Sequence, residues 1–224
     1  ESKDAYAPFL IIDNESEETQ EHFLSSEEHT RSSNSEITPR IDQMVLQAQQ
    51  WLNATYTGRH GYTPVAETGK TGNNVVKGLI TALQIELGIA EPTGTFGPTT
   101  ASLCPTLSTS SPQGNIVKIL QYGLYCKGYQ PRGTTGKFAD GTKAAVMKVQ
   151  TDAGLEGTGV VDPVLFKAIL NTDALVLIAN GDPKIRTMQQ TLNRNYLAYI
   201  GIMPCDGVYG RNTNKALIYA LQTE

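Results

Sequence analysis

The sequence has few of the residues on which metal and nucleotide chemistry depends. Only three of its 224 residues are histidines, and two of them, His22 and His29, lie in an acidic N-terminal segment. No His-x-His, His-Glu-x-x-His or Cys-x-x-Cys pattern occurs, so we expect no metal site. His60 lies in a turn-like stretch and is interpreted as a solvated loop residue. Without a Gly-x-Ser-x-Gly elbow or a phosphate-binding loop, the commonest nucleophile and nucleotide sites are excluded, and no cofactor is expected.

Long apolar runs are also missing. None approaches the ~20 residues that cross a bilayer, so we expect no membrane insertion. The chain begins at Glu1 without a charged-then-apolar leader, which indicates that any secretion signal has been removed or was never included.

Cysteine is scarce, and Cys104, Cys126 and Cys205 are an odd number. One disulfide with one thiol left over is an option, and so is a bond between Cys205 and a cysteine beyond the end of the chain. Spacing does not choose between these pairings. Three isolated cysteines are more typical of small apolar fillers or a structural bridge than of a site.

Basic residues are rare in the first forty positions, which hold ten carboxylates against three cationic side chains, a net charge of −7. A segment so rich in Ser and Glu cannot bury enough apolar surface to offset its ordering cost, so residues 1–40 are predicted to be a disordered spacer, with an optional local element at 7–12. Since the whole chain carries −4, the remainder carries +3. That modest excess suits an anionic polymer such as a cell wall and does not suggest nucleic acid.

The sequence repeats itself. Residues 72–84 and 210–222 align without a gap and share Gly, Asn, Lys, Leu-Ile and Ala-Leu-Gln, and a more divergent copy occupies 138–150. An upstream segment also recurs, with Gln49, Gln121 and Gln189 as its equivalent positions. These glutamines are 72 and 68 residues apart, so each unit is a small domain and not a solenoid turn.

Each unit is predicted to be helical. Apolar residues of the upstream segments (45–52, 117–124 and 185–192) fall on one helical face, and the segments ending in Ala-Leu-Gln have the same period. Gly88 and Gly154 are expected to end two of these helices. A third, short helix is predicted to begin at Pro98 and at Pro163, where proline suits the first turn.

The predicted fold class is therefore mainly α, with tandem small three-helix units at 41–110 and 111–180 and an incomplete third unit at 181–224. The third unit lacks its short helix because only two residues follow Gln222. Units of this size bury little core, so each is expected to be marginal alone and the third to be the least stable.

The arrangement resembles the peptidoglycan-binding domain of bacterial cell-wall hydrolases, a three-helix module. Its signature Asp-Gly-x-Phe-Gly-x-x-Thr is matched by Asp-Gly-Val-Tyr-Gly-Arg-Asn-Thr at 206–213, and its Gly-Val-Val-Gly-Pro-x-Thr by 94–99 and 159–163. The amino-acid sequence of residues 205–222 is also similar to that of multidomain surface proteins in which such repeats precede a glycoside-hydrolase-like barrel. The resemblance implies non-catalytic, secreted or cell-wall-associated binding of peptidoglycan, with a catalytic domain downstream in a longer protein.

A glycan-binding groove needs aromatic platforms beside amide and hydroxyl side chains, and helix starts supply backbone N–H groups for a peptide carboxylate. The candidate ligand-binding residues are Tyr62, Asn73, Asn74, Tyr125, Tyr129, Tyr209, Arg211 and Asn212. For each aromatic the alternative is a core role, which is most favoured for Trp51, and each Asn is as typical of a helix cap.

Two other functions are weighed. Glycosidase chemistry needs a facing pair of carboxylates, whereas Asp140, Asp152, Asp162, Asp173, Asp182 and Asp206 lie mostly beside Gly or Pro or at helix starts, where Asp caps helices or stabilises turns. No catalytic residue is therefore predicted. The alternative to wall binding is a structural spacer or protein-interaction scaffold built from degenerate repeats.

Overall fold

The structure is a computed structural model that describes residues 41–223. The predicted disordered segment at 1–40 and the local element at 7–12 lie outside these residues. The described residues form one compact unit.

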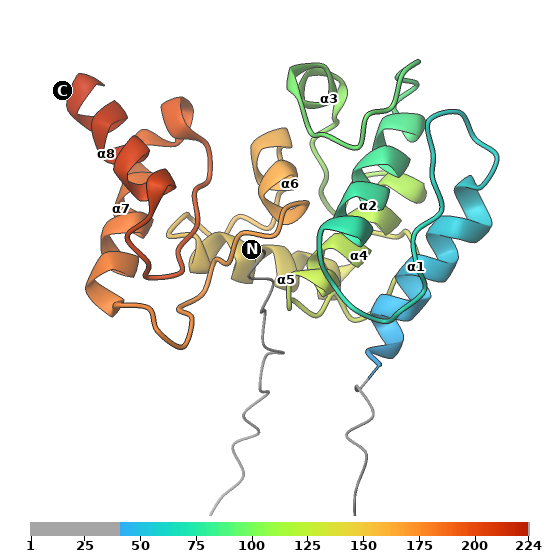
Figure 1. The fold of residues 1–224 in the computed structure, drawn as a ribbon, viewed down its shortest axis with the longest axis horizontal. Coiled ribbons are helices and arrows are strands. Elements are labelled where there is room, and N and C mark those ends of the chain that lie inside the picture. Colours follow the sequence, from blue (N-terminus) through green and yellow to red (C-terminus); the bar gives the residue numbers. More distant parts are fainter. Residues whose placement is uncertain (1–40, 224) are drawn as a thin grey trace, which may run out of the picture. The chain divides into compact units, whose positions relative to one another are not determined.

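The described chain folds into α-helices joined by loops, which confirms the mainly α prediction (Figure 1). Within residues 41–223 the one recorded β contact is an isolated antiparallel bridge between Leu107 and Val161. In chain order the helices are α1 (Gln43–Tyr56), α2 (Asn73–Glu86), α3 (Pro98–Leu103), α4 (Asn115–Cys126), α5 (Asp140–Asp152), α6 (Pro163–Ile169), α7 (Pro183–Ile200) and α8 (Arg211–Thr223).

The helix ends follow the sequence signals. Pro98 and Pro163 open α3 and α6, and Asp162 caps α6 by accepting a 2.7 Å hydrogen bond from the Leu165 N–H. Gly88 and Gly154, just past α2 and α5, have φ of +71° and +81°, the left-handed conformation that glycine adopts most easily.

A buried glutamine connects each upstream helix to the loop that leads into the next. In α7 the Oε1 of Gln189 accepts from the Gly207 N–H at 2.9 Å, and its Nε2 donates to the Val208 carbonyl at 3.0 Å and to Thr213 Oγ1 at 3.1 Å. The side-chain amide thus satisfies a backbone donor and a backbone acceptor that would otherwise be buried without partners. The same two backbone contacts are made by Gln49 with Gly69 and Lys70, and by Gln121 with Gly136 and Lys137.

A second buried glutamine lies in the next helix, α2 or α5, and binds the loop that follows that helix. Gln150 in α5 accepts from the Gly159 N–H at 2.8 Å and donates to the Val160 carbonyl and to Thr158 Oγ1, both at 2.9 Å. Gln84 in α2 makes the equivalent backbone contacts with Gly94 and Thr95. These bonds hold the loops that precede the short helices α6 and α3.

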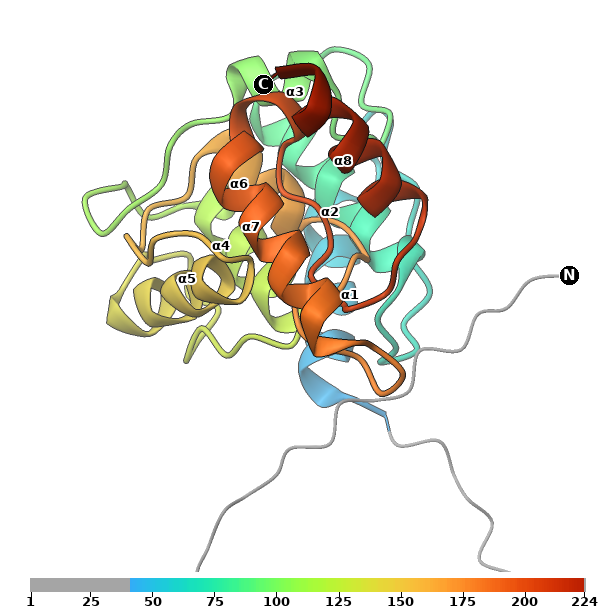
Figure 2. The same cartoon turned by 90° about the vertical axis from the view of Figure 1, so that its left-hand side faces the viewer.

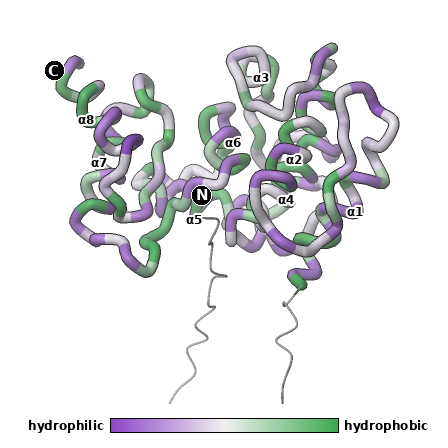
Figure 3. Tube along the Cα trace, in the orientation of Figure 1, coloured by the Kyte–Doolittle hydropathy of each residue, from purple (hydrophilic) through white to green (hydrophobic). Residues whose placement is uncertain are grey.

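The helices up to α6 share one hydrophobic core, and α7 and α8 enclose a smaller one. Figure 2 shows α7 and α8 lying side by side. Trp51 of α1, predicted to be core, is half-buried and packs edge-on against Tyr56 and at 5.3 Å between ring centroids against Tyr122 of α4. Because α2 also packs against α4, the first two predicted units are in direct contact. The smaller core consists of Leu192, Met203, Ala216 and Ala220. Figure 3 shows apolar and polar positions interspersed along every helix, as expected for helices that each bury one face.

Polar contacts fasten α7 to the end of α5. The Nδ2 of Asn193 donates to the Ala153 carbonyl at 3.0 Å, and Arg194 Nε donates to the Gly154 carbonyl at 3.1 Å. Gln190 donates in the same way to the Asp152 carbonyl at 3.0 Å. These carbonyls have no partner within their own helix, so α7 supplies the C-terminal cap of α5.

The three cysteines are free thiols: Cys104 and Cys205 are buried, and Cys126 is half-buried. Burial raises the pKa of each thiol to about 12, so the reactive thiolate is rare at neutral pH. The structure therefore gives these cysteines a packing role.

The contribution of a buried glutamine to stability can be tested by substituting Gln49 and its exposed neighbour Gln50. Gln49→Ala should lower the free energy of unfolding by about 2 kcal/mol, because it leaves the Gly69 N–H and the Lys70 carbonyl without their partner. Gln50→Ala, the matched exposed control on the same helix, should change it by less than about 0.5 kcal/mol. Urea unfolding followed by circular dichroism measures both, and equal effects would contradict the assignment.

Candidate ligand-binding surface

The turn before α8 is the most firmly held of the predicted ligand-binding segments. Asp206 Oδ1 accepts from the Val208 N–H at 2.8 Å and from Gln189 Nε2 at 3.0 Å. Gly207 has φ of +79°, and a Cβ there would lie 2.5 Å from the Leu177 side chain and 2.8 Å from the Asp182 carbonyl oxygen. Glycine is therefore required at this position, and the next side chains project from a turn that these contacts hold.

Three predicted residues leave this turn on the solvent side. Tyr209 is 54% exposed, and its hydroxyl donates to Asn214 Oδ1 at 3.3 Å. Arg211 and Asn212 occupy the first turn of α8 and are exposed. Among the described residues neither side chain has a hydrogen-bond or ion-pair partner, so both retain their hydrogen-bonding capacity for a ligand.

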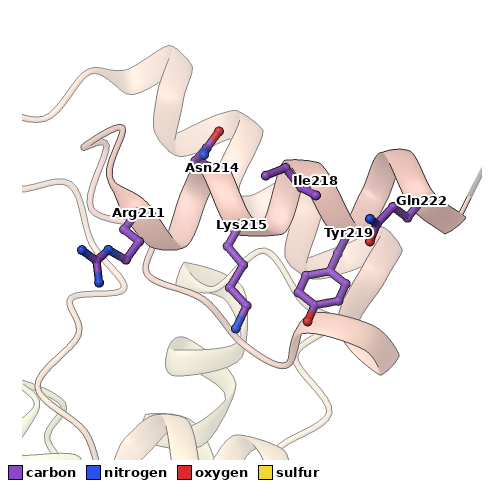
Figure 4. Close-up of a pocket in the computed structure, with 6 residues that line it drawn as sticks. All are labelled: Arg211, Asn214, Lys215, Ile218, Tyr219 and Gln222. Atoms are coloured by element: carbon purple, nitrogen blue, oxygen red, sulfur yellow. The ribbon is translucent and has the colours of Figure 1, made fainter.

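A shallow hollow of about 470 Å³, wide open to solvent, lies along α8 from this point (Figure 4). Arg211, Lys215 and Tyr219, four residues apart, point to the same side of the helix. The Lys215 Nζ lies 5.6 Å from the centre of the Tyr219 ring, within cation–π range. The other lining residues are Asn214, Ile218 and Gln222.

Two of the other predicted tyrosines lie in the core. Tyr62 is 8% exposed and donates to Asn53 Oδ1 at 3.0 Å, and burial raises its pKa to about 12. Tyr129 is 6% exposed and donates to Asp152 Oδ2 at 3.0 Å, and burial followed by the charge of Asp152 raises its pKa. Neither ring is available as a flat platform for a sugar in this conformation.

The remaining predicted residues are on separate helices. Tyr125 of α4 is half-buried, and its hydroxyl donates to Asp42 Oδ2 at 3.3 Å, which links α4 to the start of α1. Asn73 and Asn74 are exposed in the first turn of α2, apart from α8 (Figure 1). The N-cap of α2 is Gly72 and no side chain caps it, so neither asparagine serves as the cap.

Sequence reasoning missed Asn214, Lys215 and Tyr219. The signal was present, because 211, 215 and 219 follow the four-residue spacing that places side chains on one helical face. Helical periodicity is usually recognised from apolar residues, whereas this row of side chains is mainly polar.

Within residues 41–223, no group of three His, Cys, Asp or Glu side chains could hold a metal ion. No helix there is both long and apolar enough to span a membrane.

A family model described as "FadG/YbfG, PGDB-like domain" matches residues 41–119 and 178–224, more than half of the chain. The chain belongs to the FadG/YbfG PGDB-like domain family. A model described as "Putative peptidoglycan binding domain" matches residues 113–169, which contain α4, α5 and α6. The exposed surface at the start of α8 lies in the second FadG/YbfG-matched segment.

Two relatives come from Bacillus subtilis (strain 168). The uncharacterized protein YbfG is 54% identical over 188 residues, which are 82% of this chain and 26% of YbfG. The uncharacterized protein FadG is 47% identical over 191 residues, which are 82% of this chain and 33% of FadG. The chain thus spans about a quarter to a third of the length of these relatives, and no solved structure matches it.

Removing the hydroxyl group of a buried tyrosine and of an exposed tyrosine should change the free energy of unfolding by different amounts. Tyr129→Phe should lower the free energy of unfolding by about 1 kcal/mol, because it removes a buried hydrogen bond to Asp152. Tyr209→Phe, at an exposed hydroxyl, should be neutral. Urea denaturation of both variants measures the difference; a larger loss for Tyr209→Phe would contradict the assignment.

Proposed function

We propose that residues 41–224 are a non-catalytic peptidoglycan-binding segment that holds a longer, secreted or cell-wall-associated bacterial protein on its polymer. The observation that carries this proposal is the surface at the start of α8. There a turn held by Gln189 presents an exposed Tyr209 next to Arg211 and Asn212. The matches to peptidoglycan-binding models support the choice of polymer.

The three side chains suit the chemistry of peptidoglycan. The ring of Tyr209 offers an apolar face to a sugar, and the Asn212 amide can exchange hydrogen bonds with hydroxyl and acetamido groups. The guanidinium of Arg211 can bind a stem-peptide carboxylate in a bidentate manner, and the free N–H groups at the start of α8 favour the same charge. Glycan and peptide would then be recognised at one surface.

We further propose that the chain is a tandem array of three such modules with unequal binding strength. In each module the upstream glutamine (Gln49, Gln121 or Gln189) binds the backbone of a glycine. The residue two places after that glycine differs between the modules: it is Thr71 in the first, Phe138 in the second and Tyr209 in the third. Phe138 is buried at 2% exposure and Thr71 has no ring, so the third module is the principal contact. Asn73 and Asn74 on α2 supply a weaker contact in the first module, and linked contacts of this kind raise the overall affinity.

Three carboxylates among the described residues support a non-catalytic role. Asp162 and Asp182 cap helices, and Asp152 accepts from Tyr129 and lies 3.6 Å from Arg186. Their environments are those of structural groups and not of an acid and base facing a cleft. We place catalysis, in the form of a glycoside-hydrolase-like barrel, in a downstream domain of the longer protein.

The test is co-sedimentation of the purified chain with insoluble peptidoglycan, with cellulose and chitin as controls and an assay for released sugar. We expect selective pelleting with peptidoglycan and no release. Release of sugar by the chain alone would overturn the non-catalytic assignment, and equal pelleting with all three polymers would overturn the choice of ligand.

Substitutions at the surface sharpen the test. The triple variant Tyr209→Ala, Arg211→Ala, Asn212→Ala should bind at least about tenfold more weakly, because interface energy concentrates in a few aromatic and arginine contacts. Asn73→Ala with Asn74→Ala should lower binding less, and Gln50→Ala should not change it. Circular dichroism verifies folding of each variant. Unchanged binding by a folded triple variant would exclude this surface.

A second candidate, a rigid spacer or protein-interaction scaffold, is favoured by one observation. The α7 side chains cap the end of α5, and α1, α2 and α4 pack together, so residues 41–223 form one continuously packed body. A folded chain that pellets with none of the polymers would favour the spacer over the binding segment.

A further inference from the structure

The second module has two exposed apolar side chains at positions where the first module has threonines. Met147 of α5 is 40% exposed, and Val160 in the loop after α5 is 39% exposed. Counted from the glutamine at the helix end, Thr81 is the equivalent of Met147, and Thr95 follows the loop glycine of the first module as Val160 follows that of the second. The fold accepts threonine at these positions in the first module, so it does not itself require apolar side chains there.

The loop glycine makes these two apolar residues neighbours. An added Cβ at Gly159 would lie 3.2 Å from Met147 Cγ, so the methionine lies against the backbone of this glycine. Val160 is the next residue, and two hydrogen bonds hold its backbone: its carbonyl accepts from Gln150 Nε2 at 2.9 Å, and its N–H donates to Thr158 Oγ1 at 3.2 Å. The valine is therefore fixed beside a methionine, whose flexible side chain adapts readily to a ligand.

A lysine lies next to the same glycine. An added Cβ at Gly159 would lie 2.6 Å from Lys143 Cγ and 3.0 Å from its Cε, so the lysine stem runs along the loop and carries the ammonium group to its side. Lys143 and Met147 are four residues apart, which places them on one side of α5. Lys143 is exposed, and within residues 41–223 it has no hydrogen-bond or ion-pair partner. Its charge is therefore available to an anionic group.

The first module keeps the lysine without the apolar pair. An added Cβ at Gly94 would lie 2.5 Å from Lys77 Cγ and 3.0 Å from its Cε, which is nearly the same stem position as that of Lys143. Thr81 is 5% exposed, and its hydroxyl donates to the Lys77 carbonyl at 2.9 Å. The first module therefore offers the charge without an exposed apolar neighbour, and it serves as a matched control within the chain.

We propose that Lys143, Met147 and Val160 form a second binding site, in the second module, for the D-alanine end of a peptidoglycan stem peptide. The alanine methyl groups pack on Met147 and Val160, and the terminal carboxylate accepts hydrogen bonds from the Lys143 ammonium group. An aliphatic pair suits methyl groups better than the hydroxyl groups of a glycan strand. This inference rests on the proposed function, because the wall supplies the peptide.

The peptide site supplements the surface at Tyr209. It consists of one apolar pair and one exposed ammonium group, so it binds weakly by itself. Because the second and third modules belong to one packed body, contacts at both act on the same polymer and raise the overall affinity. The second module, whose Phe138 is buried, thus contributes through a different surface from the third.

The test is an NMR titration of the full chain, labelled at its methionine and valine methyl groups, with N-acetyl-L-lysyl-D-alanyl-D-alanine. The same tripeptide with a C-terminal amide is the matched control. We expect the methyl resonances of Met147 and Val160 to shift with the free acid, and the amide to bind at least about fivefold more weakly, because it lacks the charge that Lys143 binds. Equal binding of the acid and the amide would overturn the proposal.

Substitutions locate the site. Lys143→Gln, and Met147→Thr combined with Val160→Thr, should each weaken tripeptide binding by at least about fivefold, because they remove the charge or the apolar contact. The two threonines copy the first module, so folding is retained, and circular dichroism verifies it. Lys77→Gln should leave binding unchanged. Unchanged binding by folded Lys143→Gln, or an equal loss in Lys77→Gln, would overturn the proposal.

Co-sedimentation separates this inference from the proposed function. Lys143→Gln should reduce pelleting with intact peptidoglycan but not with glycan strands from which the stem peptides have been removed. If the native chain pellets with peptidoglycan while the tripeptide shifts neither methyl resonance, the peptide site is wrong and the proposed function stands. If the tripeptide binds at Met147 and Val160 but the chain does not pellet with peptidoglycan, wall binding is wrong, and the wall peptide is excluded as the occupant.

Discussion

The fold depends on buried glutamine side chains whose amides form hydrogen bonds with the backbone of the loops between helices. Gln49, Gln121 and Gln189 each sit in the core and pair with one N–H and one C=O of a loop that makes no regular secondary structure. A buried loop without such partners would leave backbone groups unsatisfied, and this penalty would exceed what the small cores could offset. The amide also fixes where the following helix begins, since its partners lie within a few residues of the first turn.

This constraint separates framework from function within one sequence pattern. The glutamine and its glycine determine the path of the loop, whereas the residue two places further on varies from Thr71 to Phe138 to Tyr209. Before α5 that residue, Phe138, is buried in the core, and before α8 the equivalent Tyr209 is exposed to solvent. The exposure of this position therefore differs between the repeats while the glutamine contacts stay the same, which is consistent with the proposed difference in binding strength.

Much of this framework could be predicted because the sequence repeats, so equivalent positions can be compared within the chain. The spacing of Gln49, Gln121 and Gln189 indicates the length of the repeat. Proline predicts the starts of α3 and α6, and glycine predicts the ends of α2 and α5. Tyr209, Arg211 and Asn212 were candidates in the sequence because an aromatic ring precedes polar side chains at a helix start, and the structure leaves all three exposed. Their binding of a ligand stays a prediction.

Burial of individual tyrosines could not be predicted in the same way. The hydroxyl of Tyr129 reaches Asp152, 23 residues away, and Tyr62 is held by Asn53 across a loop. Whether a tyrosine ring is exposed to a ligand or buried in the core depends on neighbours that are distant in the sequence. The spacing of residues within one helix carries no information about them. The packing of Trp51 on Tyr122 is a contact between repeats, so a comparison of the repeats with one another does not reveal it.

The central claim is that one polar, aromatic surface at the start of α8 binds peptidoglycan. It is tested most directly by two-dimensional NMR of the isotope-labelled chain during titration with soluble peptidoglycan fragments. The account predicts chemical-shift changes concentrated at Tyr209, Arg211, Asn212 and Asn214, with smaller changes at Asn73 and Asn74. Changes centred on other surfaces, or no change at saturating fragment, would contradict it.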